Sequence, residues 1–316
     1  MHFPPITRRD CLALLGLPAC GGIAAAATAA GTPPALQDHM PAFWQAYDAH
    51  PDGPPDARAQ ALVQAFFAPR AADYRRAGVP ATPDRVARWL PTFDAMAADV
   101  RDVHRRFGDG YARHLAGFRA ALPDFDGQAS PVALLPSLLH FDAHLQPDGA
   151  QLPLFFGPDG IVRFHGAGAD LGVLFAHELF HCYQAQMNPS MCLAEHPPVY
   201  AGLWIEGTAT YASERLQPGA SLLHVLLDAP ELLAMDAAAV RTVARALLAH
   251  LDRTDDAAQA LFFDAGTHGD WPPRAGYLVG LHCARRVGEA LALPAMARLP
   301  APRVREALAS ALRSFG

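Results

Sequence analysis

The sequence predicts an α+β fold, in which a helical N-terminal layer precedes a small mixed sheet and a mostly helical C-terminal part. Before residue 131, Asp56–Phe67 and Pro83–Phe107 carry apolar residues three and four positions apart, the spacing of one helix face. From Pro131 the pattern changes to short apolar runs bounded by turn residues, which favours strands. Beyond Asp170 the helical spacing returns and continues to the C-terminus. At 316 residues the chain is long enough for a large core.

Residues 1–30 are expected to form an export signal. The pair Arg8-Arg9 and the weakly apolar run Cys11–Ala30 resemble a twin-arginine signal. Cleavage after Ala27-Thr28-Ala29 would release a soluble protein, whereas the weaker lipobox that ends at Cys20 would leave a lipid anchor there. An uncleaved anchor or no export is the third alternative. We expect an exported protein, periplasmic or secreted, that meets a membrane only if Cys20 is lipidated.

Residues 31–130 are expected to form the helical layer, and Pro91 is expected to kink its longest helix. The predicted helices of this layer are Ala42–Ala49, Asp56–Phe67, Pro83–Phe107 and Gly110–Leu122.

The region 131–316 is expected to begin with the sheet. Its predicted strands are Val132–Leu139, Phe141–Leu145, Leu152–Phe156 and Ile161–Phe164. Pro136 would confine the first strand to an edge, and Gly157-Pro158-Asp159-Gly160 would turn the last two into a hairpin. Six helices are then predicted after the helix that begins at Asp170, over Leu203–Leu216, Ser221–Met235, Ala237–Leu251, Asp256–Asp264, Gly276–Leu293 and Pro302–Phe315.

The charge and composition argue against a nucleic-acid partner. All 25 basic residues are Arg, the net charge is −6, and no basic cluster occurs in the body of the chain. We attribute the absence of Lys to codon bias.

The segment Asp170–Pro189 carries the pattern of greatest chemical interest. Asp170 is a good N-cap, and the apolar residues that follow recur at helical spacing. On such a helix His177 and His181 share one face, so both can direct a ring nitrogen at one metal ion. Glu178 sits one residue round, where it can reach a water on the open side of the metal. The alternative is a buried amphipathic helix whose histidines are satisfied core residues.

A zinc site with two His needs a third protein ligand and an open position for water. Glu206 is the better candidate, because it lies 25 residues beyond His181, enough for a loop and a helix that returns beside the first. Glu195 and His196 are nearer in sequence, but they lie in a proline-containing loop that would position them less well.

The motif His177-Glu178-x-x-His181, followed by Glu206-Gly207-x-Ala209, resembles the gluzincin branch of the zincin-like metallopeptidases. The resemblance implies a zincin-like catalytic region over 131–316 and one Zn²⁺ ion. It also implies that both His and Glu206 bind the zinc and that Glu178 is the general base. The family often has an acidic residue four positions after the third ligand, where this chain has Thr210.

Hydrolysis by such a site also needs a donor for the oxyanion that forms on the substrate. Tyr277 is the first candidate and His282 the second, both in the C-terminal helical part, and Tyr211 and Arg274 are weaker ones. An edge strand near Ile161–Gly166 is expected to pair with an extended peptide backbone. His165 beside it is either a helper there or a structural residue.

Of the five cysteines, Cys182, Cys192 and Cys283 lie outside the expected leader. In an oxidising compartment one pair could bridge, and Cys182–Cys192 closes the shortest loop.

The sequence therefore predicts an exported zinc metallopeptidase that acts on peptide or protein substrates, without nucleic acid. Two alternatives remain at this point: a zinc-stabilised envelope binding or assembly protein without catalysis, and a hydrolase of non-peptide amides.

Overall fold

The computed structural model describes residues 36–50, 52–266 and 269–315. Within these ranges the protein is a mixed α+β structure with one four-stranded sheet. Helices make up the N-terminal and C-terminal parts of the chain, so the predicted fold class is confirmed. The expected export signal, with its twin arginine and Cys20, lies outside the described residues. Within the described residues, no helix is both long enough and apolar enough to cross a membrane.

The sheet is short and mixed. Its strands are β1 (Gln37–Asp38), β2 (Val132–Leu134), β3 (Ala143–Leu145) and β4 (Leu154–Phe156). Their order is β1-β2-β4-β3, with β2 parallel to both of its neighbours and β3 antiparallel to β4. Because β1 comes from the N-terminal layer, that layer and the sheet are one packed unit. β3 forms the edge of the sheet nearest the His177–His181 motif, because β3 contacts the helix that carries this motif.

The N-terminal layer contains fewer breaks than predicted. Its α-helices are α2 (Met40–Asp48), α3 (Pro55–Leu62), α4 (Ala71–Arg76) and α5 (Pro83–Ala121), and a π-helical turn continues α3 over Val63–Phe67. The two helices expected over Pro83–Phe107 and Gly110–Leu122 are one helix, α5. Phe107 and Tyr111 are both buried and contact Phe175, so the apolar face continues across the glycines between them.

The predicted hairpin is wrong in its second half, because Pro158–His165 forms a helix, α6, and not a turn and strand. Pro158 occupies the first helical position, where its missing N–H costs nothing. Gly160 allows close packing, since a Cβ there would lie 1.8 Å from the carbonyl oxygen of Phe141. The edge expected near Ile161–Gly166 is therefore not available for pairing with a peptide.

Asp159 explains why this segment folds back onto the sheet. Its carboxylate is fully buried and accepts hydrogen bonds from the backbone N–H groups of Ser137 and Leu139, from the Ser137 hydroxyl and from the Trp89 indole. These bonds hold the loop after β2 in place. The strand expected over Val132–Leu139 ends at Leu134, so Pro136 follows β2 and does not confine it to an edge.

The C-terminal part is helical, as predicted, although its helices are more divided than expected. Its helices are α7 (Leu171–Met187), α8 (Pro189–Cys192), α9 (Val199–Leu216), α10 (Leu222–Val225), α11 (Pro230–Leu233), α12 (Ala237–His250), α13 (Asp256–Phe263), α14 (Ala275–Gly288), α15 (Leu293–Ala297) and α16 (Ala301–Arg313). The single helix expected over Ser221–Met235 is divided into α10 and α11, because Leu227 and Asp228 adopt left-handed backbone angles, φ 53° and 57°.

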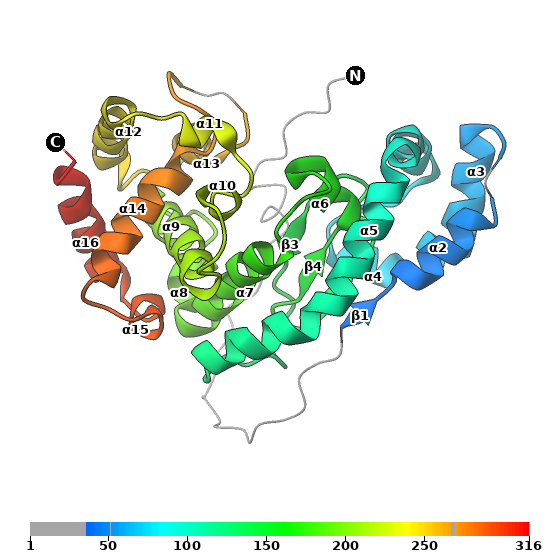
Figure 1. Ribbon diagram of the computed structural model, residues 1–316, viewed down its shortest axis with the longest axis horizontal. Coiled ribbons are helices and arrows are strands. Elements are labelled where there is room, and N and C mark those ends of the chain that lie inside the picture. The colour runs from blue at the N-terminus through cyan, green and yellow to red at the C-terminus, as the bar shows by residue number, and fades with distance from the viewer. Residues whose placement is uncertain (1–35, 51, 267–268, 316) are drawn as a thin grey trace.

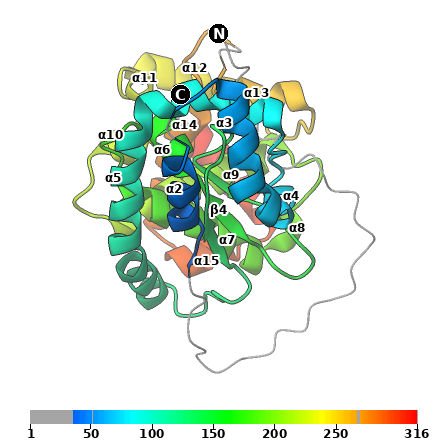
Figure 2. The ribbon, with the colours of Figure 1, turned by 90° about the vertical axis from the view of Figure 1, so that its right-hand side faces the viewer.

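Two apolar cores meet at α9, which contributes residues to both. One lies under α2–α5, the sheet and α7, and the other under α9, α12, α14 and α16. Figure 1 shows α2 and α3 at one end of the molecule, α12 and α16 at the other, and α7 and α9 between them. From the N-terminal side, α2 and α3 lie in front, and α5 lies to one side of β4 and α7 (Figure 2). The contact between α7 and α9 therefore joins the two halves.

Candidate metal centre

The helix α7 forms as its sequence predicts. The Asp170 carboxylate accepts hydrogen bonds from the backbone N–H groups of Gly172, at 2.9 Å, and Val173, at 3.1 Å. Two N–H groups of the first turn, which have no partner within the helix, are thereby satisfied. The helix ends at Met187, before Asn188 and Pro189. Most of its residues are buried, because it lies between the sheet and α9.

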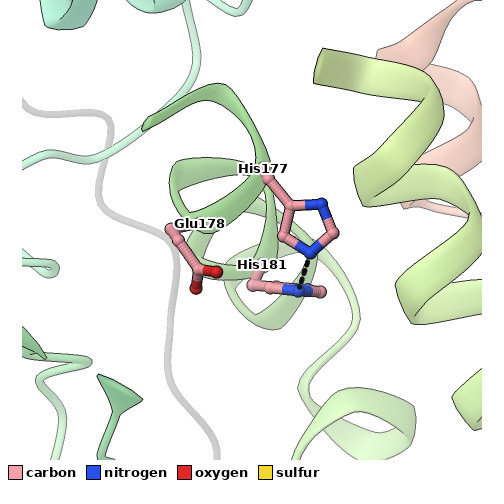
Figure 3. Close-up of side chains that lie close together, drawn as sticks. All are labelled: His177, Glu178 and His181. Carbon is pink, nitrogen blue, oxygen red and sulfur yellow. Dashed lines mark hydrogen bonds between the residues drawn. The ribbon is translucent and has the colours of Figure 1, made fainter. Parts of the chain in front are cut away.

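The two motif histidines meet on one face of α7. Their Nε2 atoms are 3.0 Å apart and their rings are nearly perpendicular, at 85° (Figure 3). The ligand atoms of His177, Glu178 and His181 all lie within 4.8 Å of one another, so the group is able to hold a metal ion. His177 is buried, whereas His181 and Glu178 are partly exposed, which leaves the site open to solvent on their side.

Glu206 reaches the same point from α9. Its Oε2 atom lies 3.5 Å from Nε2 of His177 and 3.4 Å from Nε2 of His181, and the residue is 5% exposed. Ligands held at about 2.0–2.2 Å in a tetrahedron have donor atoms roughly 3.3–3.6 Å apart. The two separations that involve Glu206 fall in this range, and the 3.0 Å between the two histidine nitrogens is somewhat shorter, so the three atoms can surround one zinc ion after a small adjustment of the rings.

The other proposed third ligands lie elsewhere. Glu195 and His196 are exposed, with side chains 74% and 65% accessible, and Nε2 of His196 lies 4.0 Å from Oε1 of Glu195. Thr210, which stands where the family often has an acidic residue, donates its hydroxyl to the Glu206 carbonyl at 2.8 Å. The Thr210 hydroxyl is therefore bonded within α9 itself. The Nδ1 atom of His177 has no hydrogen-bond partner among the described residues.

The protonation of the group also suits a metal site. Burial lowers the pKa of His177, which favours the neutral ring that binds metals. Burial raises the pKa of Glu178 to about 8; Asp142 and Glu206 add to this rise, and His181 opposes it. A bound cation would act in the opposite direction and favour the carboxylate. Figure 3 shows the Glu178 carboxylate beside the histidine pair, on the same helix.

Tyr277 lies against the site, and His282 does not join it. The Tyr277 ring stacks on the His177 ring, with centroids 6.2 Å apart and planes 11° apart. His282 lies five residues further along α14, about 140° round the helix from Tyr277. Its ring packs against Phe315, with centroids 6.0 Å apart, near the end of the chain.

The two weaker donors have other neighbours. Arg274 lies over the Tyr277 ring, with its Cζ atom 5.9 Å from the centroid. Tyr211 packs against Gly288, where a Cβ would meet the Tyr211 hydroxyl at 2.4 Å.

Cys182 and Cys283 take no part in the candidate centre. Both are buried free thiols, so the shortest predicted bridge, Cys182–Cys192, is not formed. Burial raises the pKa of Cys182 to about 12, which keeps it as a neutral thiol and not a ligand.

Sequence reasoning missed a polar cluster beside this centre. Asp142, before β3, and Asp228, between α10 and α11, both contact His165 at the end of α6. No motif spacing links these residues, because each comes from a different element. Only His165 was a candidate from the sequence.

We compared the chain with models of protein families, with curated proteins and with solved structures, and none of these comparisons found a match. The functional proposal therefore depends on the geometry of the centre.

Proposed function

We propose that the protein is an exported zinc-dependent metallohydrolase of the gluzincin type, and that it cleaves amide bonds in peptides or proteins. The observation that carries the proposal is the position of the Glu206 carboxylate, 3.5 and 3.4 Å from the two imidazole nitrogens of the His-Glu-x-x-His helix. A buried carboxylate facing two histidines at these distances is the donor set of a catalytic zinc site with one open position. Export is proposed from the twin-arginine motif in residues 1–30.

In this proposal His177, His181 and Glu206 hold the zinc. When bound, zinc would lower the pKa of its water from about 15.7 towards about 7 and polarise the substrate carbonyl. Glu178 accepts the proton of the attacking water and passes it to the leaving amine. The Tyr277 hydroxyl donates to the oxyanion.

A peptide is the preferred substrate because β3 is an edge strand beside α7. The N–H of Gly157 donates to the carbonyl of Asp142, at 2.8 Å, and the N–H of Gln146 donates to that of Pro153, at 3.1 Å. Since bonding directions alternate along a strand, the backbone groups of Ala143 and Leu145 point away from β4. The N–H of Ala143 already donates to the Asp142 carboxylate, so an extended peptide can add to that side of β3 through the Ala143 carbonyl and the backbone groups of Leu145.

Metal analysis of the purified mature protein, with variants, tests the proposal. We expect about one zinc per chain, less zinc after dialysis in Glu206→Gln and His177→Ala, and full zinc without hydrolysis in Glu178→Gln. Glu195→Gln, the same change at an exposed site, is the matched control and should keep both zinc and activity.

Each result separates the alternatives. Unchanged zinc in Glu206→Gln would remove Glu206 as a ligand, and retained turnover in Glu178→Gln would remove it as the base. Bound zinc without cleavage of any peptide or protein pool would favour the non-catalytic binding protein. Cleavage of non-peptide amides alone would favour the third alternative.

A further inference from the structure

His165 joins two loops that are far apart in the sequence. Its side chain is 3% exposed. Nε2 lies 2.6 Å from Oδ2 of Asp142, and Nδ1 lies 3.3 Å from Oδ2 of Asp228. We call this group of three residues the His165 clasp.

The geometry favours a charged ring. A carboxylate oxygen faces each ring nitrogen of His165, at 2.6 Å and 3.3 Å, and carboxylate oxygens only accept hydrogen bonds, so a ring protonated on both nitrogens suits both contacts. The position of His165 at the C-terminal end of α6 also favours a positive charge. Although burial lowers the pKa of His165, its hydrogen bonds to Asp142 and Asp228 raise it to about 9.

Each end of the clasp is attached to a defined piece of backbone. Asp142 accepts from the N–H of Ala143 through Oδ1, at 2.7 Å, at the start of β3. Leu227 and Asp228 form the left-handed turn between α10 and α11, with φ angles of 53° and 57°, a conformation that is unfavourable for residues other than glycine. The clasp therefore holds this strained turn against the first residue of the edge strand.

Other charged groups surround the clasp. His224 on α10 lies with Nε2 3.8 Å from Asp228 and Nδ1 3.7 Å from Asp170, the N-cap of α7. Asp142 and His165 are also close enough to the Glu178 carboxyl to affect its pKa in opposite directions. The clasp thus lies beside the candidate centre without contributing a ligand to it.

We propose that His165 is a positioning residue, whose imidazolium holds the start of β3 to the α10–α11 turn and so fixes the strand along which an extended substrate binds. The substrate part of this inference rests on the proposed function; the clasp itself does not.

The first experiment measures the clasp without any substrate. At pH 7, His165→Gln and, separately, Asp228→Asn should increase amide hydrogen exchange in residues 142–146 and 222–229, with zinc content unchanged. His196→Gln, the same change at an exposed histidine, should not. Exchange equal to that of the wild type in both segments of both variants would overturn the proposal.

The pH dependence of stability provides a second readout. The folded pKa of His165 lies above its ordinary value of 6.5, so the clasp contributes fully below pH 6.5 and is lost as pH rises through about 9. The stability difference between wild type and His165→Gln should therefore shrink between pH 6 and pH 10. A constant difference would contradict a charged clasp.

Kinetics test the positioning role. His165→Gln should raise KM with little change in kcat, because the catalytic groups keep their places while the docking strand loosens. Faster exchange with an unchanged KM would overturn the positioning role. If the wild type hydrolyses nothing, the proposed function fails, whereas exchange and stability still decide the clasp.

Discussion

Gly207 on α9 and Gly280 on α14 lie with their backbones in contact. A Cβ at Gly207 would lie 2.5 Å from the carbonyl carbon of Gly280, and one at Gly280 would lie 2.8 Å from Cα of Gly207. Glu206 precedes the first glycine, and Tyr277 lies about one turn before the second. The close crossing therefore places both side chains beside His177.

Replacing either glycine with alanine should disturb the centre. We expect Gly207→Ala and Gly280→Ala to destabilise the protein by about 1–3 kcal/mol, because the helices must separate, and to reduce zinc retention. Chemical denaturation and metal analysis measure the two effects. Gly117→Ala is the control, since a Cβ at this helical position meets nothing within 4 Å and should stabilise the protein by about 0.5–1 kcal/mol. Normal stability and zinc in both variants would contradict the tight crossing.

Tyr277 and His282 can be separated as oxyanion donors. Tyr277→Phe removes only the hydroxyl and keeps the ring that stacks on His177, so we expect kcat to fall about 10²-fold with zinc content unchanged. His282→Asn, at the residue packed against Phe315, should keep kcat close to that of the wild type. Steady-state kinetics on the same substrate decide between them, and the reverse result would make His282 the donor.

Asp159 should be intolerant even of an isosteric change. Each of its carboxylate oxygens accepts from at least one backbone N–H, that of Ser137 or of Leu139. In Asp159→Asn the amide NH₂ would face one of these donors, so we expect a loss of about 2–4 kcal/mol in denaturant unfolding. Asp109→Asn, at an exposed position, should change stability by less than about 1 kcal/mol. Equal stability of the two variants would remove the structural role of Asp159.

His144 on β3 should contribute to acid sensitivity. It is 4% exposed and stacks on Phe141, and burial lowers its pKa to about 4. The unfolded chain therefore binds this proton more readily than the folded one, so stability is present above pH 6.5 and is lost as pH falls towards 4. In His144→Gln, the loss of stability between pH 6.5 and 4 should be smaller, by up to about 3 kcal/mol. The free energy of unfolding is measured by denaturation at several pH values. If it falls between pH 6.5 and 4 as much in the variant as in the wild type, His144 is not a neutral buried residue.

The sequence alone determined the helix over 171–187 and the meeting of its two histidines. Both follow from local rules: a side-chain cap at Asp170, apolar spacing, and the fact that residues four apart share a helix face. It also placed Glu206 on a helix that returns beside the first. These are short-range properties, or depend on one loop of adequate length.

The tertiary structure alone decided what lies around that helix. The segment 158–165 is a helix because a buried Asp159 carboxylate and the close contact of Gly160 stabilise it against the loop after β2. Tyr277 rather than His282 faces His177 because two glycines let α9 and α14 touch. The His165 clasp joins three segments with no shared spacing. Contacts of this kind depend on how segments far apart in the sequence pack together. The periodicity of apolar residues within one segment carries no information about that packing.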